Sequence, residues 1–193
     1  VSEGVGLPVV VENDANAAGW AEARFGAGAG KANVLVVTLG TGVGGAVVID
    51  GHLVRGAAGF AAEIGHISIV PDGRPCGCGL RGCLERYASG TALGVNGWEL
   101  AKFRPAYAAR IIELSGGDQN KISGKAVTAA AREGDPAALE CYERLGDALG
   151  QGLADLAAVL DPEVIVLTGG LTEAGDILLT PVTKAFDQYL TAR

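Results

Sequence analysis

The chain has 193 residues, 49% of them hydrophobic, which is enough for one folded core or one lobe of a larger enzyme. Its formal net charge is −7 and no lysine or arginine stripe is visible, so a nucleic-acid partner is not expected. No apolar run has the length needed to span a bilayer and no signal peptide is evident, so we expect a cytoplasmic protein without membrane contact.

The first part of the chain predicts a strand, a helix and a strand hairpin. Val9-Val10-Val11 predicts a short buried strand, and residues 15–25 predict a helix that ends before Gly26. The apolar run 34–39 is typical of a central strand, and residues 46–49 predict a second strand. A third strand is expected from Leu53, because Asp50-Gly51 is a strong hairpin turn signal.

The turn between the first two strands of this hairpin is rich in glycine, with the sequence Gly40-Thr41-Gly42-Val43-Gly44-Gly45. A dinucleotide-binding fingerprint or a P-loop would be followed by a helix, and a P-loop also needs a lysine. Neither fits, because the next element is a strand. Either the backbone N–H groups and the Thr41 hydroxyl bind phosphate, or this is a hairpin without a ligand. The residues of this turn leave both possibilities open.

Residues 56–90 predict an irregular segment that contains a metal site. His66, Cys76, Cys78 and Cys83 follow the spacing His-x9-Cys-x-Cys-x4-Cys, and glycines at 77, 79 and 82 let the backbone turn sharply. The alternative is a group of reactive or merely buried cysteines. One histidine with three thiolates is a common structural zinc set, and four protein ligands leave no open position for catalysis. We therefore predict structural Zn²⁺.

The second half of the chain is mostly helical. Residues 91–134 are mixed, and Asp135-Pro136 predicts the start of a long helix that Asp161-Pro162 ends. That helix carries a small-residue stripe of Gly146, Gly150 and Ala154, which permits close packing on a neighbour. Residues 164–167 predict a buried strand, and a last helix is expected near Pro181. Strands and helices in mixed order indicate an α/β architecture.

Three carboxylates stand at positions that allow a function. Asp14 lies at the predicted strand-to-helix junction, where an N-cap is the common role. Glu63 and Glu85 lie close in sequence to the ligands His66 and Cys83. They are either solvated charges, hydrogen-bond partners of the metal ligands, or acceptors for the hydroxyls of a polyol. His52 is expected at the surface and Cys141 in the core.

Several motifs together resemble the ROK family of sugar kinases and repressors. They are ENDAN at 12–16, LGTGVGGAV at 39–47, Gly56, EIGH at 63–66, CGCGLRGCLE at 76–85 and LTGGL at 167–171. The resemblance covers essentially the whole chain, and residues 69–73 and 87–90 are most similar to the bacterial, actinobacterial-type ATP-dependent glucokinase branch. It implies an α/β actin-like ATPase (ribonuclease H-like) fold. Residues 1–16 would end the small N-terminal lobe at the cleft edge, and residues 17–193 would form the large C-terminal lobe with an inserted zinc loop at 63–86.

The resemblance also implies roles for single residues in the phosphorylation of glucose to glucose 6-phosphate by ATP with Mg²⁺. Asp14 would be the general base, and Asn13, Asp14, Glu63, His66 and Glu85 would bind the sugar. The residues that would bind the nucleotide are Gly40, Thr41, Gly42, Gly44, Gly169 and Gly170. A homo-oligomer, a dimer or tetramer, is expected.

Two segments of the family pattern are missing from this sequence: the first phosphate hairpin and a closing C-terminal helix. We therefore expect a fragment truncated at both ends, which as an isolated piece would lack activity. A sugar-responsive ROK repressor is the alternative from another functional class. Within the kinases, fructose, mannose, N-acetylglucosamine and N-acetylmannosamine are alternative substrates.

Overall fold

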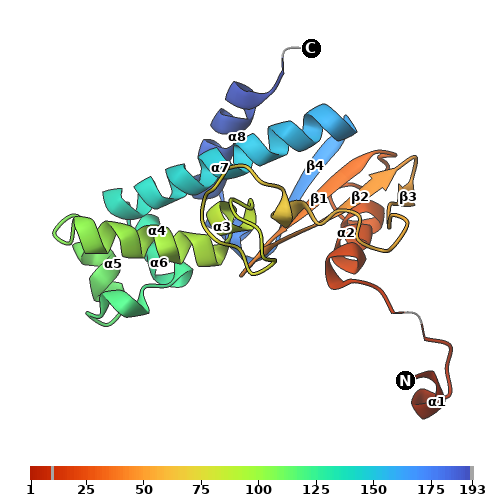
Figure 1. Cartoon of the computed structure of the whole chain (residues 1–193), viewed down its shortest axis with the longest axis horizontal. Coiled ribbons are helices and arrows are strands. Elements are labelled where there is room, and N and C mark those ends of the chain that lie inside the picture. The colour runs from red at the N-terminus through yellow and green to blue at the C-terminus, as the bar shows by residue number, and fades with distance from the viewer. Residues whose placement is uncertain (10, 192–193) are drawn as a thin grey trace.

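The computed structural model describes residues 1–9 and 11–191 and contains a four-stranded mixed sheet with helices on both faces (Figure 1). The strands, in the order β3-β2-β1-β4, are β3 (His52–Leu53), β2 (Val43–Ile49), β1 (Val34–Leu39) and β4 (Val164–Thr168). β1 pairs antiparallel with β2 and parallel with β4. The predicted α/β class and the predicted hairpin are confirmed.

Strand β1 is buried on both faces, and its side chains alternate between two cores. Val34 and Val36 belong to a small core that also contains Ala23 of helix α2 (Asp14–Phe25). The side chains of Leu35, Val37 and Leu39 belong to the larger core on the opposite face, against the helices that follow β3. This explains why the strand is a continuous apolar run rather than an alternating one.

The remaining helices form most of the larger core. They are α3 (Glu85–Ala88), α4 (Gly90–Phe103), α5 (Ala109–Leu114), α6 (Gly124–Arg132), α7 (Pro136–Leu160) and α8 (Asp176–Tyr189), with short 3-10 turns η1 (Ile64–His66), η2 (Gln119–Lys121) and η3 (Gly170–Ala174). In the part of the chain that the structure describes, no helix has the length and apolar character to cross a membrane.

Helix α7 is the longest helix and packs along α8 (Figure 1). Asp135 caps its start, because the carboxylate accepts a hydrogen bond from Ala138 N at 2.9 Å, as predicted. A methyl group added at Gly146 would lie 2.6 Å from Pro181 Cβ, and one at Gly150 would lie 2.5 Å from Ala185 Cβ. The predicted small-residue stripe therefore provides the close approach of α7 to α8.

Two predictions about elements are wrong. Val9 and Val11 are exposed and belong to no strand, while Val10 lies outside the described residues. They follow the short helix α1 (Ser2–Val5), which buries none of its residues and lies apart from the sheet (Figure 1). The last helix begins at Asp176 and contains Pro181 in its interior. Pro181, which cannot donate a backbone hydrogen bond, is buried against Gly146 of α7.

Candidate functional site

Four metal-ligating side chains meet in the cysteine loop, residues 63–86. The candidate ligand atoms of His66, Cys76, Cys78 and Cys83 all lie within 4.8 Å of one another. His66 Nδ1 is 3.6 Å from Cys76 Sγ, and the sulfurs of Cys78 and Cys83 are 3.7 Å apart. Tetrahedral zinc, with Zn–S bonds of about 2.3 Å and Zn–N bonds of about 2.0 Å, separates its ligand atoms by roughly 3.6 to 3.8 Å. The predicted set of side chains therefore fits such an ion.

Glycines shape the backbone around these ligands. Gly79 and Gly82 have φ angles of 91° and 77°, a region that side-chain-bearing residues rarely adopt. A methyl group at Gly82 would also overlap the Val70 carbonyl. Both positions therefore require glycine if Cys76, Cys78 and Cys83 are to converge.

The environment of the thiols differs within the cluster. The backbone N–H of Leu80 is the main cause that lowers the pKa of the exposed Cys78. Burial, with the neighbouring thiols as the second cause, raises the pKa of Cys83 to about 12. Metal binding requires thiolates, so a cation at this cluster would displace a proton from Cys83.

The orientation of His66 gives its two ring nitrogens different surroundings. Nδ1 is the ring nitrogen that faces Cys76 Sγ, while Nε2 lies on the opposite side of the ring from that contact. A metal at Nδ1 would leave the ring proton on Nε2, which could then donate a hydrogen bond to a ligand. His66 as a whole is half-buried.

The first residues of β2 are the point where the predicted sugar-binding segments meet. Glu85 Oε2 accepts a hydrogen bond from Val43 N at 3.2 Å, and a side chain at Gly42 would overlap that carboxylate. The turn η1, which ends at His66, packs on the same strand, since a methyl group at Gly65 would overlap the Val43 carbonyl. Two segments of the cysteine loop are therefore held against one short stretch of backbone.

Helix α2 approaches the same stretch from another side. A methyl group at Gly44 would lie 3.1 Å from Ala15 Cβ, next to Asp14. In this structure Gly42 and Gly44 permit close packing toward Glu85 and Ala15. The glycine-rich turn thus brings the start of α2 and the cysteine loop together.

Asp14 is the first residue of α2 and is exposed, and the helix cap is its neighbour. Asn13 Oδ1 accepts a hydrogen bond from Asn16 N at 3.1 Å, so the interpretation of Asp14 as the N-cap is wrong. One carboxylate oxygen, Asp14 Oδ1, accepts from Ala15 N at 2.9 Å. The Asp14 carboxylate is therefore held by its own helix start.

Glu12 links the start of α2 to Arg55, a contact that the sequence did not indicate. Its carboxylate accepts hydrogen bonds from Asn13 N and Asn16 Nδ2, and it pairs with Arg55 Nε at 2.7 Å. Arg55 is the main cause that lowers the pKa of Glu12. The ion pair links the start of α2 to the segment after β3. Only the side-by-side arrangement of these segments could have revealed it.

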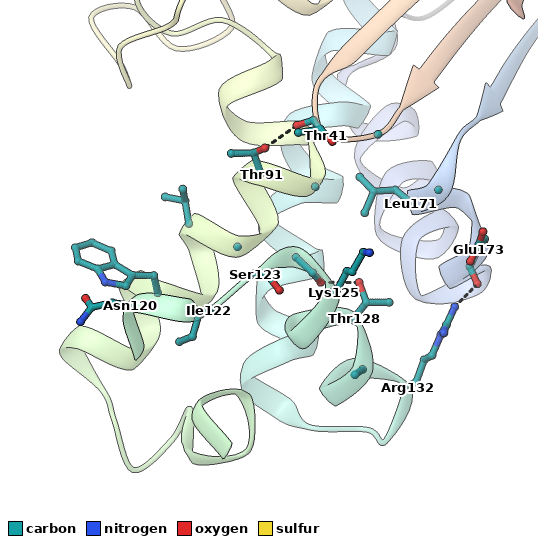
Figure 2. A pocket seen from close by; sticks show the side chains of 18 residues that line it. Thr41, Thr91, Asn120, Ile122, Ser123, Lys125, Thr128, Arg132, Leu171 and Glu173 are labelled. Carbon is teal, nitrogen blue, oxygen red and sulfur yellow. Dashed lines mark hydrogen bonds between the residues drawn. The ribbon is translucent and has the colours of Figure 1, made fainter. Parts of the chain in front are cut away.

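A cavity of about 1090 Å³ lies beside the carboxyl ends of β1 and β4 (Figure 2). Gly40 and Thr41, from the turn after β1, and Gly170, from the turn after β4, form part of its wall. Because the two strands are parallel neighbours, their carboxyl ends lie at one sheet edge, where open α/β sheets bind ligands. The two predicted glycine loops therefore meet at one cavity.

The remaining predicted nucleotide residues lie behind this wall. Gly169 has a φ of 99°, and a methyl group on it would lie 2.6 Å from the Leu39 carbonyl oxygen. Among the described residues, Gly42, Gly44 and Gly169 do not line the cavity. Their place in the structure is close backbone packing around it.

Most of the cavity wall comes from helices that the sequence did not single out. The contributing side chains are Thr91, Val95 and Trp98 from α4, and Lys125, Thr128 and Arg132 from α6. Figure 2 shows these two helices on one side and Leu171 of η3 on the other. Thr91 Oγ1 donates to the Thr41 carbonyl at 2.7 Å, which joins α4 to the glycine turn. The helix caps Ser89 and Ser123 mark both helix starts, but nothing in the local sequence indicates that they face each other.

The profile of the ROK family matches residues 1–193. This chain belongs to the ROK family. Its sequence is 49% identical over 186 residues to the glucokinase of Streptomyces coelicolor, covering 96% of this chain and 59% of that protein. It therefore spans less than two thirds of the length of that relative.

Two solved structures of ROK proteins superpose on the chain. A ROK family glucokinase from Streptomyces griseus, in complex with glucose and AMPPNP, matches with a TM-score of 0.93 and 48% identity over 100% of this chain and 62% of that one. A ROK family transcriptional regulator, a homologue of the E. coli MLC protein, matches with a TM-score of 0.77 and 31% identity over 98% of this chain and 46% of that one. The predicted family and its actin-like ATPase fold are confirmed.

Proposed function

We propose that this ROK chain belongs to an ATP-dependent kinase that phosphorylates glucose to glucose 6-phosphate. The observation that carries the proposal is that the nucleotide cavity, the cysteine loop and the start of α2 all meet at the glycine-rich turn 40–45. Gly40 and Thr41 line the cavity, while the next residues, from Gly42 on, contact Glu85, the turn that ends at His66, and the start of α2. The likeness to a glucokinase structure with glucose and AMPPNP supports glucose and ATP as the two substrates.

Asp14 is the proposed general base, which takes the proton from the sugar 6-hydroxyl as the phosphoryl group is transferred. The proposed sugar contacts are Asn13, Asp14, Glu63, His66 and Glu85. The side-chain oxygen Oδ1 of Asn13 caps the helix, so the side-chain NH₂ group of Asn13 remains for a sugar hydroxyl. For Glu85, Oε2 is engaged by Val43 N and Oε1 remains as an acceptor.

The proposed nucleotide site uses Gly40, Thr41, Gly42, Gly44, Gly169 and Gly170. Of these, Gly40, Thr41 and Gly170 line the cavity and would contact the nucleotide, with Gly170 on the adenosine side, while Gly42, Gly44 and Gly169 would support the wall by close backbone packing. Phosphoryl transfer is catalysed mainly by positioning and charge stabilisation, and Mg²⁺ bound with ATP would neutralise charge on the phosphates. Glu85 packs closely on Gly42 and Ala15 on Gly44, so these two glycines would contribute by bringing the sugar-binding residues close to the phosphate-binding turn.

For the cluster of His66, Cys76, Cys78 and Cys83 we propose structural Zn²⁺. The four side chains fill a tetrahedral shell, so the ion would hold the loop and orient the His66 ring. Cytoplasmic location, a homo-oligomer, and the absence of nucleic-acid and membrane partners stay predictions.

The function is tested by a coupled ATP assay of the full-length protein against hexoses. We expect kcat/KM for glucose to exceed that for fructose, mannose, N-acetylglucosamine and N-acetylmannosamine by about tenfold or more, since missing or misplaced hydroxyls leave site groups unpaired. A higher value for one of these sugars would reassign the substrate. No turnover of any hexose, together with glucose binding, would favour a sugar-responsive repressor, which the likeness to a ROK regulator makes the second candidate.

Lys125 provides a test of the nucleotide cavity. Its side chain lines the wall with both glycine loops, and an ammonium there suits an anionic nucleotide (Figure 2). Replacing Lys125 with alanine should raise KM for ATP by about 10- to 150-fold, because a charge-assisted contact contributes about 1.5 to 3 kcal/mol. KM for glucose should not change.

Lys121→Ala is the matched control for this experiment. Lys121 lies 3.8 Å from Asp118 in the same region, and it does not line the cavity. The control should keep the ATP KM of the unchanged protein. Equal ATP KM values for the two variants would exclude Lys125 from the nucleotide site.

A further inference from the structure

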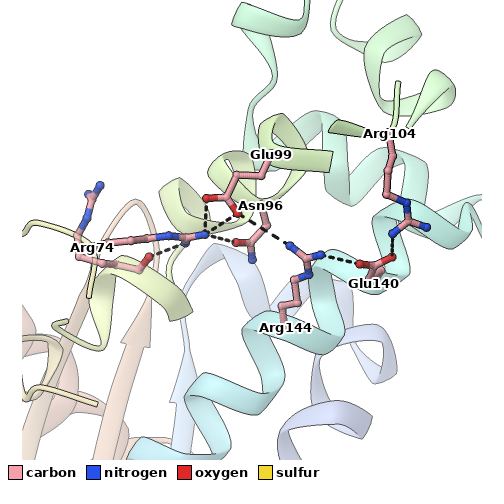
Figure 3. Close-up of polar contacts among 7 residues, drawn as sticks. Arg74, Asn96, Glu99, Arg104, Glu140 and Arg144 are labelled. Carbon is pink, nitrogen blue, oxygen red and sulfur yellow. Dashed lines mark hydrogen bonds and ion pairs between the residues drawn. The ribbon is translucent and has the colours of Figure 1, made fainter. Parts of the chain in front are cut away.

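Arg74 lies in the cysteine loop, two residues before Cys76, and its side chain joins three separate segments (Figure 3). Toward α4, Nη2 lies 2.9 Å from both carboxylate oxygens of Glu99 and 3.0 Å from Asn96 Oδ1. Asn96 is buried, with 3% of its surface exposed, so this contact reaches into the core. The cysteine loop is therefore tied to α4 by a charged, partly buried side chain.

The same arginine also binds helix α3, which begins at Glu85. Arg74 Nη1 donates to the Arg86 carbonyl at 3.0 Å, and the guanidinium lies over the Tyr87 ring at 5.0 Å. The backbone N–H of Arg74 donates to Tyr87 Oη at 2.6 Å. Arg74 thus contacts the two residues that directly follow Glu85.

The position of α3 decides where the Glu85 carboxylate lies. α3 has only four residues, so its own hydrogen bonds do little to fix its orientation. Its first residue, Glu85, reaches Val43 N in the glycine turn. Asn96 and Glu99, on the other side of Arg74, belong to the helix whose Thr91, Val95 and Trp98 line the cavity. The Arg74 side chain therefore ties α3 to the helix that borders the nucleotide cavity, in addition to the packing of α3 on α7.

We propose that Arg74 is a positioning residue for sugar binding, which holds α3 so that Glu85 meets the substrate hydroxyls. This inference rests on the proposed glucokinase function. Arg74 does not line the nucleotide cavity, and its proposed effect on the sugar is transmitted through α3. A lysine could not replace it fully, because one ammonium lacks the planar fork that reaches Glu99 and the Arg86 carbonyl together.

The test is Arg74→Gln in the full-length protein, with Arg104→Gln as the matched control. Arg104 lies at the far end of the same charge network, where it pairs with Glu140, and Glu140 pairs with Arg144 (Figure 3). Arg74→Gln should raise KM for glucose about tenfold, keep KM for ATP within about twofold, and keep one metal ion per chain. Arg74→Lys should give an intermediate glucose KM, and Arg104→Gln should leave both KM values within about twofold.

An unchanged glucose KM in Arg74→Gln would overturn the proposal, as would a glucose KM raised equally in Arg104→Gln. Equal rises in the KM values for glucose and ATP would also overturn it, because they would indicate a general loss of structure. If the unchanged protein phosphorylates no hexose, the proposed function fails by itself. In that case, amide hydrogen exchange of residues 84–89 tests whether Arg74 holds α3 in position. Exchange about tenfold faster in Arg74→Gln alone supports the positioning role, and equal exchange in both variants overturns it.

Discussion

Replacing Asp14 with asparagine is expected to lower kcat for glucose phosphorylation by about 10²- to 10⁴-fold and to leave glucose affinity largely intact. Asparagine has nearly the same shape and can still accept the hydrogen bond that Asp14 Oδ1 receives from Ala15 N. It cannot accept the proton of the sugar hydroxyl, and general-base catalysis corresponds to roughly 3 to 5 kcal/mol of the barrier. A coupled ATP assay and a glucose titration of the full-length protein measure the two effects separately.

Asp176→Asn is the matched control, because Asp176 is the first residue of α8 as Asp14 is of α2, and both are exposed. A negative charge at a helix start stabilises by about 0.3 to 1 kcal/mol, so both variants should lose the same small amount of stability. Only Asp14→Asn should lose turnover. Full turnover of Asp14→Asn would remove Asp14 from the role of base.

Removal of the metal from the cysteine loop is expected to abolish glucose binding, because residues 63–86 lose their order. Within this loop, β-type backbone pairing is limited to two isolated bridges, Ser68–Cys83 and Pro75–Arg81. Structural zinc contributes about 10 kcal/mol or more to the folding of its site, which this pairing cannot replace. Isothermal titration with glucose, before and after chelation with verified metal content, measures the effect. Glucose affinity that persists in a metal-free sample would contradict it.

Two cysteine variants separate loss of the metal from loss of packing. Cys78 is the exposed ligand, so Cys78→Ser removes a thiolate without opening a cavity in the core. It should release metal and weaken glucose binding. Cys141 is buried outside the cluster, and Cys141→Ala should lower the free energy of unfolding by about 1 kcal/mol and retain both metal and glucose. Equal metal content in the two variants would exclude Cys78 from the site.

Acidification should act in the same direction as chelation. The thiols must lose their protons to bind a metal ion, and burial raises the pKa of Cys83 to about 12. Proton competition therefore increases as the pH falls, and metal affinity decreases with it.

Elements whose signal is local could be predicted from the sequence. The run at β1 predicted a strand of the observed bounds, because a strand buried on both faces needs apolar residues at every position. The start of α7 at Asp135-Pro136 followed from the cap and the proline, which act within one turn. The candidate metal cluster is also local, since its four side chains and turn glycines lie within one loop.

Predictions failed where a distant contact outweighed a local preference. Three valines after Pro8 have strand propensity, but Val9 and Val11 pair with no strand of the described structure, and a strand without a partner is not stable. Pro181 suggests a helix start, yet α8 begins five residues earlier, and Pro181 lies in its interior where it packs on Gly146 of α7.

The sequence alone determined which side chains form the candidate metal cluster of His66, Cys76, Cys78 and Cys83, and that it belongs to a single loop. Tertiary structure decided what that loop stands next to. At the start of β2, Glu85, the turn that ends at His66 and the start of α2 all pack against the backbone at Gly42, Val43 and Gly44. At the carboxyl ends of β1 and β4, helices α4 and α6 complete the wall of the cavity. Those contacts join residues far apart in the chain, so no local pattern encodes them. They arise only when the sheet aligns the ends of its strands.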